Sequence, residues 1–163
     1  MSGTLNWLAV HNYPTTFFCY HINHKNITVE QFIIVSLDLG TETYHQYLPP
    51  HGFDEVPPVE PTLGVLGGYL YFSYSYEETE FVIWKMKKFG LEDSWYQFLK
   101  ISYQNRQIDY DIMDVYFQLV PLLLSEDGDT LMLHSNRERE AILYHWRDNR
   151  VQRSKIIENT FID

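Results

Sequence analysis

The sequence predicts an all-β protein, and two observations carry this prediction. Aromatic residues make up 17% of the 163 residues, with thirteen tyrosines and four tryptophans, and these residue types favour strands. A strand led by glycine also recurs, beginning at Gly3, Gly68 and Gly128, at spacings of 65 and 60 residues. Each is followed by an apolar strand, a turn and a third strand. These repeats favour about three blades of a β-propeller, although the periodicity alone also permits a β-sandwich.

The central repeat, residues 63–95, gives the clearest pattern. Aromatic and apolar runs at 69–72 and 81–86 read as strands, and a third strand opens at Trp95. The polar stretch 73–79 is predicted to be a loop that ends the first of these strands. Lysines and a glycine at 87–90 predict the turn before the third strand.

The flanking repeats contain similar pieces. Residues 32–39 form a short apolar run rich in β-branched residues, which is typical of a buried strand. Residues 115–124 are either a strand or a short helix, because Pro121 opposes one continuous helix. The Asp127-Gly128 step predicts a tight hairpin turn. The remaining predicted strands are 3–10, 44–48, 130–134, 141–146 and 151–157.

Three long segments connect these strands. Residues 11–31 are polar and aromatic, and we expect little regular structure there. Residues 49–61 hold five of the seven prolines, which excludes a central strand because proline donates no ladder hydrogen bond. Residues 102–114 are rich in Asp, Asn and Gln.

Charge and composition exclude several classes of protein. The formal net charge of −10 opposes binding to a phosphate backbone, so we expect no nucleic-acid partner. The strongest apolar stretch, 117–124, falls short of the ~20 residues that span a bilayer, so no membrane partner is expected. Cys19 is the only cysteine, and the first ten residues lack the features of a signal peptide. These features predict an intracellular protein, cytoplasmic or nuclear.

Three stretches together resemble a known family. They are IVSLDLGTETY at 34–44, LGVLGGYL at 63–70 and IWKMKKFGLEDSW at 83–95. In this order they resemble signatures of the F-box-associated domain of plant F-box proteins. Pro121-Leu122 and the Asp127-Gly128-Asp129 turn resemble later steps of the same pattern. The resemblance covers most of residues 3–157.

The resemblance implies a kelch-like partial β-propeller in a single domain, 1–163, with approximate blades at 3–49, 62–103 and 115–158. It also implies a substrate-recognition module of an SCF-type ubiquitin ligase, whose partner is a protein destined for ubiquitination. No F-box precedes Gly3, so binding to a Skp-type adaptor is expected only if an F-box is supplied. Two alternatives remain open: a carbohydrate-binding β-domain, and a truncated fragment without function.

No catalytic, cofactor-binding or metal-binding residue is predicted, and no enzyme activity is expected. Trp84 and Trp95 read as core anchors rather than as a sugar-stacking platform. A zinc site at His11, His21 and His24 lacks cysteine partners, and the calcium-like stretch 109–114 lacks the glycine and glutamate of a calcium loop. Asp38 and Glu42 flank a turn, where carboxylates usually bond locally. Recognition is instead expected in the loops, at 12–30, 51–60 and 104–114.

Overall fold

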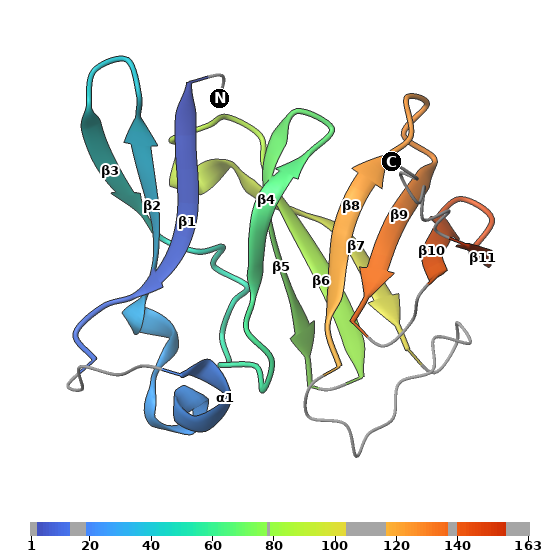
Figure 1. Ribbon diagram of the computed structural model, residues 1–163, viewed down its shortest axis with the longest axis horizontal. Helices are drawn as coiled ribbons and strands as arrows, with labels where there is room; N and C mark the ends of the chain where they lie inside the picture. Colours follow the sequence, from blue (N-terminus) through green and yellow to red (C-terminus); the bar gives the residue numbers. More distant parts are fainter. Residues whose placement is uncertain (1–2, 14–18, 78, 104–116, 137–139, 156–163) are drawn as a thin grey trace, which may run out of the picture.

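The computed structural model describes residues 3–13, 19–77, 79–103, 117–136 and 140–155. These residues form three antiparallel sheets and one short α-helix (Figure 1). The all-β prediction is therefore confirmed, and none of the three sheets is closed on itself. The strands are β1 (Thr4–Val10), β2 (Phe32–Asp38), β3 (Thr43–Tyr47), β4 (Thr62–Leu66), β5 (Tyr69–Tyr76), β6 (Glu80–Met86), β7 (Trp95–Ser102), β8 (Leu119–Leu124), β9 (Thr130–Ser135), β10 (Glu140–His145) and β11 (Arg150–Lys155).

Each sheet is a simple meander in which consecutive strands are neighbours. The first sheet has the order β1-β2-β3, the middle sheet β4-β5-β6-β7 and the last sheet β8-β9-β10-β11. Tight turns make this order accessible. For example, Gly67 and Gly68 both have positive φ, 59° and 81°, in the two-residue turn between β4 and β5.

The three sheets pack face to face, with the middle sheet between the other two. One face of the middle sheet and the inner face of the first sheet share a core that contains Phe32, Ile34, Leu70 and Phe72. The opposite face of the middle sheet packs on the last sheet in a second core, which contains Tyr71, Ile83, Leu131, Leu133 and Ile142. The first strands of the three sheets also meet, because β1 lies against β4 and β4 lies against β8.

The prediction of a loop at 73–79 is wrong for most of that segment. β5 continues to Tyr76, and Ser73 and Ser75 are buried within it. Each serine hydroxyl has a partner: Ser73 Oγ lies 2.6 Å from Thr62 Oγ1, and Ser75 Oγ lies 2.8 Å from Tyr103 Oη. These bonds satisfy the hydroxyl groups, so the polar residues are compatible with a buried strand.

The ambiguous segment near Pro121 is a strand. Pro121 lies in β8, which among the described strands has only β9 as a neighbour in its sheet. The register between the two strands shifts between Pro121 and Leu123. An edge position with a bulge is where a strand tolerates proline, because no ladder hydrogen bond from its nitrogen is needed there.

The connections are partly as expected. Residues 49–61 contain no helix or strand, in keeping with their prolines. Residues 11–31 have more regular structure than predicted: α1 (Tyr20–Asn23) is followed by 3-10 turns at His24–Asn26 and Val29–Gln31. A capping box between Thr28 and Gln31 favours the second turn. Within the ranges described above, no helix is long and apolar enough to cross a membrane.

Candidate functional site

The proline-rich connection, residues 48–61, is anchored between the first and middle sheets by Phe53. The Phe53 ring makes edge-to-face contacts with Phe32 of β2 at 5.1 Å and with Phe72 and Tyr74 of β5 at 5.0 Å between centroids. Such contacts add to the free energy gained by burying the ring. The segment therefore has a fixed path although it has no regular structure.

A second anchor joins this connection to the segment that contains α1. The hydroxyl of Tyr20 donates a hydrogen bond to the carbonyl oxygen of Pro57 at 2.7 Å. Burial of Tyr20 raises the pKa of its hydroxyl well above the ordinary range, so it remains a donor. Two of the three predicted recognition loops, 12–30 and 51–60, are thus held together. The third, 104–114, lies outside the described residues.

The two loops enclose a shallow cleft of about 370 Å³, here called the proline cleft. Its lining is mostly apolar and comes from the end of β3, the turn before β2 and the proline-rich connection. The lining residues are Val29, Glu30, Phe32, Leu48, Pro49, Pro50, His51 and Phe53. An open apolar cleft with a polar rim is suited to an extended peptide or a loop of another protein.

The rim of the proline cleft at Leu48 is fixed by β7 and the turn before it. The indole nitrogen of Trp95 donates to the carbonyl of Leu48 at 3.2 Å. The amide of Leu48 donates to Glu92 Oε1 at 2.7 Å. Because its backbone is held on both sides, Leu48 presents its side chain, 51% exposed, in a defined position.

A second hollow of about 290 Å³, here called the Trp84 pocket, lies where the same connection crosses the middle sheet. Trp84 packs so closely on Gly52 that a Cβ built on that glycine would lie 2.3 Å from the indole ring. Tyr74 donates a hydrogen bond to the Gly52 carbonyl at 2.7 Å. The other lining residues are Asp54, Tyr76, Val82, Gln97 and Lys100.

Negative charge dominates around Tyr76 at the edge of the Trp84 pocket. Asp54, and then Glu77, raise the pKa of its hydroxyl, because they oppose a further negative charge. Lys100 lies over the Tyr76 ring, 5.0 Å from its centroid, and pairs with Glu80 at 2.5 Å. A positively charged side chain of the protein, that of Lys100, thus already lines the pocket.

Trp84 and Trp95 both pack against the core shared by the first and middle sheets. Their positions agree with the prediction that they are core anchors. The sequence did not indicate that each also holds the proline-rich connection in place.

The predicted polar candidates occupy local structural positions. His11 Nε2 lies 3.1 Å from the carbonyl oxygen of Glu30, where β1 ends beside the 3-10 turn. Asp38 Oδ1 accepts hydrogen bonds from the amides of Gly40 and Thr41 at 2.8 and 2.9 Å. These two bonds lower the pKa of the Asp38 carboxyl. No group of three or more metal-ligating side chains is positioned to hold an ion in the part of the chain that the structure describes.

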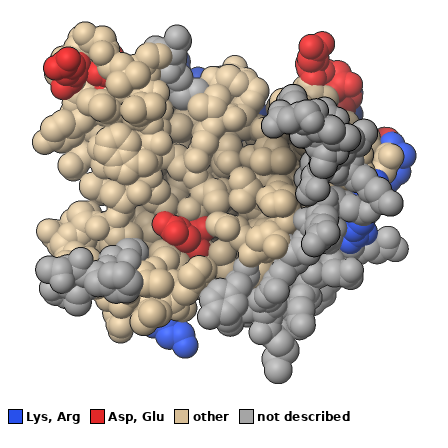
Figure 2. Space-filling view, in the orientation of Figure 1, with Lys and Arg blue, Asp and Glu red and all other residues tan. Residues whose placement is uncertain are grey.

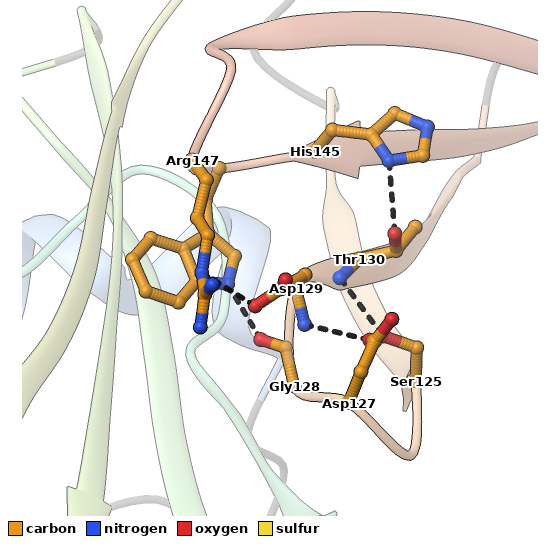
Figure 3. A network of polar contacts seen from close by, with 8 residues as sticks. Ser125, Asp127, Gly128, Asp129, Thr130, His145 and Arg147 are labelled. Atoms are coloured by element: carbon orange, nitrogen blue, oxygen red, sulfur yellow. Dashed lines mark hydrogen bonds and ion pairs between the residues drawn. The ribbon is translucent and has the colours of Figure 1, made fainter.

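The turn between β8 and β9 carries a network of polar contacts, which links residues of this turn to one another and to the turn between β10 and β11 (Figure 3). Asp127 Oδ1 accepts from the amide of Asp129 at 3.0 Å, and Ser125 Oγ accepts from the amide of Thr130 at 2.9 Å. Arg147 pairs with Asp129 at 2.6 Å, which ties this turn to the one between β10 and β11. The Asp127-Gly128 hairpin turn is therefore present as predicted.

Lys85 is a buried cation between the middle and last sheets, with 3% of its surface exposed. Its Nζ lies 3.8 Å from the centroid of the Phe98 ring and 5.7 Å from that of Tyr69. Desolvation lowers the pKa of this amine. The aromatic rings partly replace the water that a charged amine would otherwise need.

No family model matches the chain, and no curated protein or solved structure shows significant similarity to it.

Several residues that line the two hollows lie outside the three predicted recognition loops. Tyr74 and Tyr76 fall in the stretch 73–79, where the sequence predicts a connecting loop and the structure has the end of β5. Leu48 and Pro49 precede the predicted loop 51–60 by only a few residues. The density of prolines around Phe53 was a usable signal, since it predicts a rigid connection that an aromatic side chain can anchor.

Proposed function

We propose that this chain is the substrate-recognition module of an SCF-type ubiquitin ligase F-box protein, built as part of a kelch-like β-propeller. The three sequential meander sheets, with β1, β4 and β8 adjoining one another, fit the blade arrangement of a propeller. The resemblance of residues 34–44, 63–70 and 83–95 to the F-box-associated domain supports the same assignment. The proposed partner is a protein, and no chemical step is assigned to the chain.

The observation that carries the proposal is the proline cleft. Two connections far apart in sequence are locked together by the bond between Tyr20 and Pro57, and they form one apolar cleft. Rigid sheets that position loops for recognition are a common arrangement in binding proteins. A fixed cleft also lowers the conformational cost of binding a peptide segment.

The carbohydrate-binding alternative requires exposed aromatic rings that sugars can stack on. Trp84 and Trp95, the two rings considered for that role, instead pack against the core. Lys100, which lines the Trp84 pocket, is already paired with Glu80. Exposed rings such as Trp7 and Tyr44 belong to the first sheet and line neither hollow. The protein-binding proposal is therefore the one that the site favours.

The test is to capture interacting proteins with the intact chain and with the variant Leu48→Asp, using chemical crosslinking and mass spectrometry. Leu48→Asp places a charge on the apolar rim, so we expect loss of the crosslinks that the wild type makes through residues 29–53. The matched control is Leu91→Asp, because Leu91 is 47% exposed and is not part of the proline cleft. A partner that wild type and Leu91→Asp both bind, and Leu48→Asp does not, supports the proposal.

Two further measurements address the ligase assignment. The partner identified in this way should become ubiquitinated when the chain is joined to an F-box and assembled with the adaptor and cullin. Binding without ubiquitination would reject the ligase assignment but leave protein recognition standing. Crosslinks unaffected by Leu48→Asp, or binding to a glycan array in place of proteins, would reject the proline cleft as a protein site.

A further inference from the structure

The first sheet has one described strand fewer than the other two. The middle and last sheets each end in a fourth strand, β7 and β11, which pairs antiparallel with the strand before it. The first sheet stops at β3, which among the described strands pairs only with β2 (Figure 1). From β3 the chain enters the proline-rich connection, and prolines do not supply the amides that a fourth strand needs. The fourth-strand position beside β3 is therefore open.

Alternation of the hydrogen bonds shows which backbone groups of β3 face this open edge. The bond from the amide of Leu39 to the carbonyl of Gly3 continues the ladder between β1 and β2. Because backbone groups alternate in direction along an antiparallel strand, odd-numbered residues of β2 bond to β1 and even-numbered residues bond to β3. The partners of the even-numbered residues in β3 are Thr43, His45 and Tyr47. The amides and carbonyls of Tyr44 and Gln46 therefore point to the open edge.

Leu48, the next residue in this alternation, shows where the open edge ends. Its amide donates to Glu92 Oε1 and its carbonyl accepts from the indole of Trp95, so both groups already have partners. Within the part of the chain that the structure describes, no hydrogen bond from outside β2 reaches the backbone of Tyr44 or Gln46. The open edge thus spans β3 itself and stops at the rim of the proline cleft.

β3 lacks the features that usually prevent an edge strand from pairing, which are charged side chains, prolines and bulges. The other strands at sheet edges show such features: β8 has Pro121 and a register shift, β7 has Lys100, and β11 has Arg150 and Arg153. The sequence of β3 is TYHQY, its first four residues are exposed, and its register with β2 is regular. An edge of this kind is suited to pairing with an extended segment of another chain.

The surroundings of the edge define the chemistry of that segment. Tyr44 is 68% exposed and lies in a row with Leu37 and Leu5, so a residue placed opposite Tyr44 meets an apolar and aromatic surface. Asp38 and Glu42 flank the turn before β3, whereas no strand of the first sheet contains Lys or Arg. Figure 2 shows acidic side chains over this turn. A strand antiparallel to β3 reaches the turn with its C-terminal side, so a basic residue is favoured there.

We propose that the protein partner adds an extended segment of about five residues, the length of β3, as the fourth strand of the first sheet. The segment runs antiparallel to β3, with an apolar or aromatic residue opposite Tyr44 and a basic residue at its C-terminal end. Its N-terminal side passes Leu48 and meets the proline cleft. This inference rests on the proposed function, because it states how the partner of the proline cleft is held.

A second copy of the chain matches this chemistry less well. Antiparallel pairing of two β3 strands places the acidic turn of one copy beside residues 87–94 of the other, because that segment contacts Tyr47 and Leu48. Residues 87–94 contain two lysines and two acidic residues, so they offer no net positive charge to the turn. A basic segment of a different protein does.

The first test uses random linear peptides displayed on phage and selected on the wild-type chain. We expect the selected peptides to bind the wild type and Gln46→Ala equally, since alanine keeps the amide at position 46. Gln46→Pro removes that amide, and we expect affinity to fall about tenfold or more, because a peptide carbonyl loses its donor. Failure to select any peptide, or equal binding by all three proteins, would overturn the proposal.

The second test uses the wild-type chain alone, so it does not depend on how Gln46→Pro folds. Each amide of a selected peptide is methylated in turn. We expect two positions, two residues apart, to lose about tenfold or more in affinity, because their amides bond to Tyr44 and Gln46. The position between them should tolerate methylation, since its amide points away from β3. Losses without this alternation would contradict a fourth strand.

The crosslinked partner separates this inference from the proposed function. A partner that Leu48→Asp loses and Gln46→Pro also loses supports the fourth strand. A partner that Leu48→Asp loses and a folded Gln46→Pro retains rejects the fourth strand and leaves recognition at the proline cleft standing. A partner that both variants retain rejects both proposals. A wild-type dimer that Gln46→Pro dissociates, measured by light scattering, would overturn the proposal in favour of a second copy at this edge.

Discussion

At the scale of the residue, the contact between Gly52 and Trp84 decides how the proline-rich connection crosses the middle sheet. The indole ring occupies the space that any Cβ at position 52 would need. Glycine is needed at position 52 because a side chain has no room there. The backbone conformation does not require it, since Gly52 is not among the residues with positive φ. A single methyl group at this position therefore forces either the ring or the connection to move.

We predict that Gly52→Ala lowers the free energy of unfolding by about 1–3 kcal/mol, the usual cost of overpacking. Urea unfolding monitored by circular dichroism measures the change. The control is Gly40→Ala, where the added Cβ would meet only the Asp38 carboxylate at 3.3 Å; we expect it to change stability by less than about 0.5 kcal/mol. Equal effects of the two substitutions would show that Trp84 accommodates the methyl group.

Tyr74 gives a prediction for alkaline pH. Burial raises the pKa of its hydroxyl from 10.0 to about 12, so the unfolded chain loses this proton first. The contribution of the Tyr74 hydroxyl to the free energy of unfolding is fully present below pH 10. It is lost as pH rises through the window from about 10 to about 12. Urea midpoints across that window should fall less steeply for Tyr74→Phe than for wild type, and identical slopes would contradict the assignment.

At the scale of the element, β5 explains why part of the site was missed. Its second half contains serines that a pattern of apolar residues does not assign to a buried strand. The partners that satisfy them, Thr62 and Tyr103, come from β4 and from the residue after β7. Only the assembled sheet brings these hydroxyl groups together, so a local reading of the sequence cannot anticipate that they are paired.

The tie between the α1 segment and the proline-rich connection is the element-scale feature that shapes the proline cleft. We predict that Tyr20→Phe destabilises the fold by about 1–3 kcal/mol, because the buried carbonyl of Pro57 loses its donor. Hydrogen–deuterium exchange should become faster across residues 51–56 while exchange in β5 and β6 is unchanged. The control, Tyr69→Phe, removes a hydroxyl from a ring that is 44% exposed. If it destabilised the fold and speeded exchange at 51–56 as much as Tyr20→Phe, the effect could not be assigned to the bond between Tyr20 and Pro57.

At the scale of the whole molecule, the middle sheet takes part in both cores, whereas among the described residues the first and last sheets each take part in one. The outer face of the first sheet exposes Leu5, Trp7 and Tyr44. Sheets with uncovered apolar faces and free edges tend to associate. The stability of the chain is therefore expected to depend on its own concentration.

We predict that the thermal midpoint of the wild type rises with protein concentration, because binding of a second copy favours the folded state by mass action. Differential scanning fluorimetry over a wide concentration range measures this. Leu5→Asp should abolish the dependence, and Ile22→Asp should retain it. A sharp unfolding transition of a monomer, independent of concentration, would contradict this prediction.

The elements that local chemistry controls could be predicted from the sequence. The aromatic and β-branched runs at 32–39, 81–86 and 95–101 became strands, the Asp127-Gly128 step became a hairpin turn, and prolines kept 49–61 out of the sheets. The repeated spacing of glycine-led strands indicated the three-part order of the chain. Each of these features depends on residues close to one another in sequence.

Which faces of the sheets meet, and where the candidate site lies, could not be predicted from local patterns. The proline cleft needs the turn before β2, the end of β3 and residues 49–53 in one place, and the bond from Tyr20 to Pro57 spans 37 positions of the chain. The same holds for the two faces of the first sheet, because the alternation along a strand gives two faces but does not say which one is covered. Coverage depends on how the sheets pack, and that is decided by the apolar surface of the whole chain rather than by any single segment.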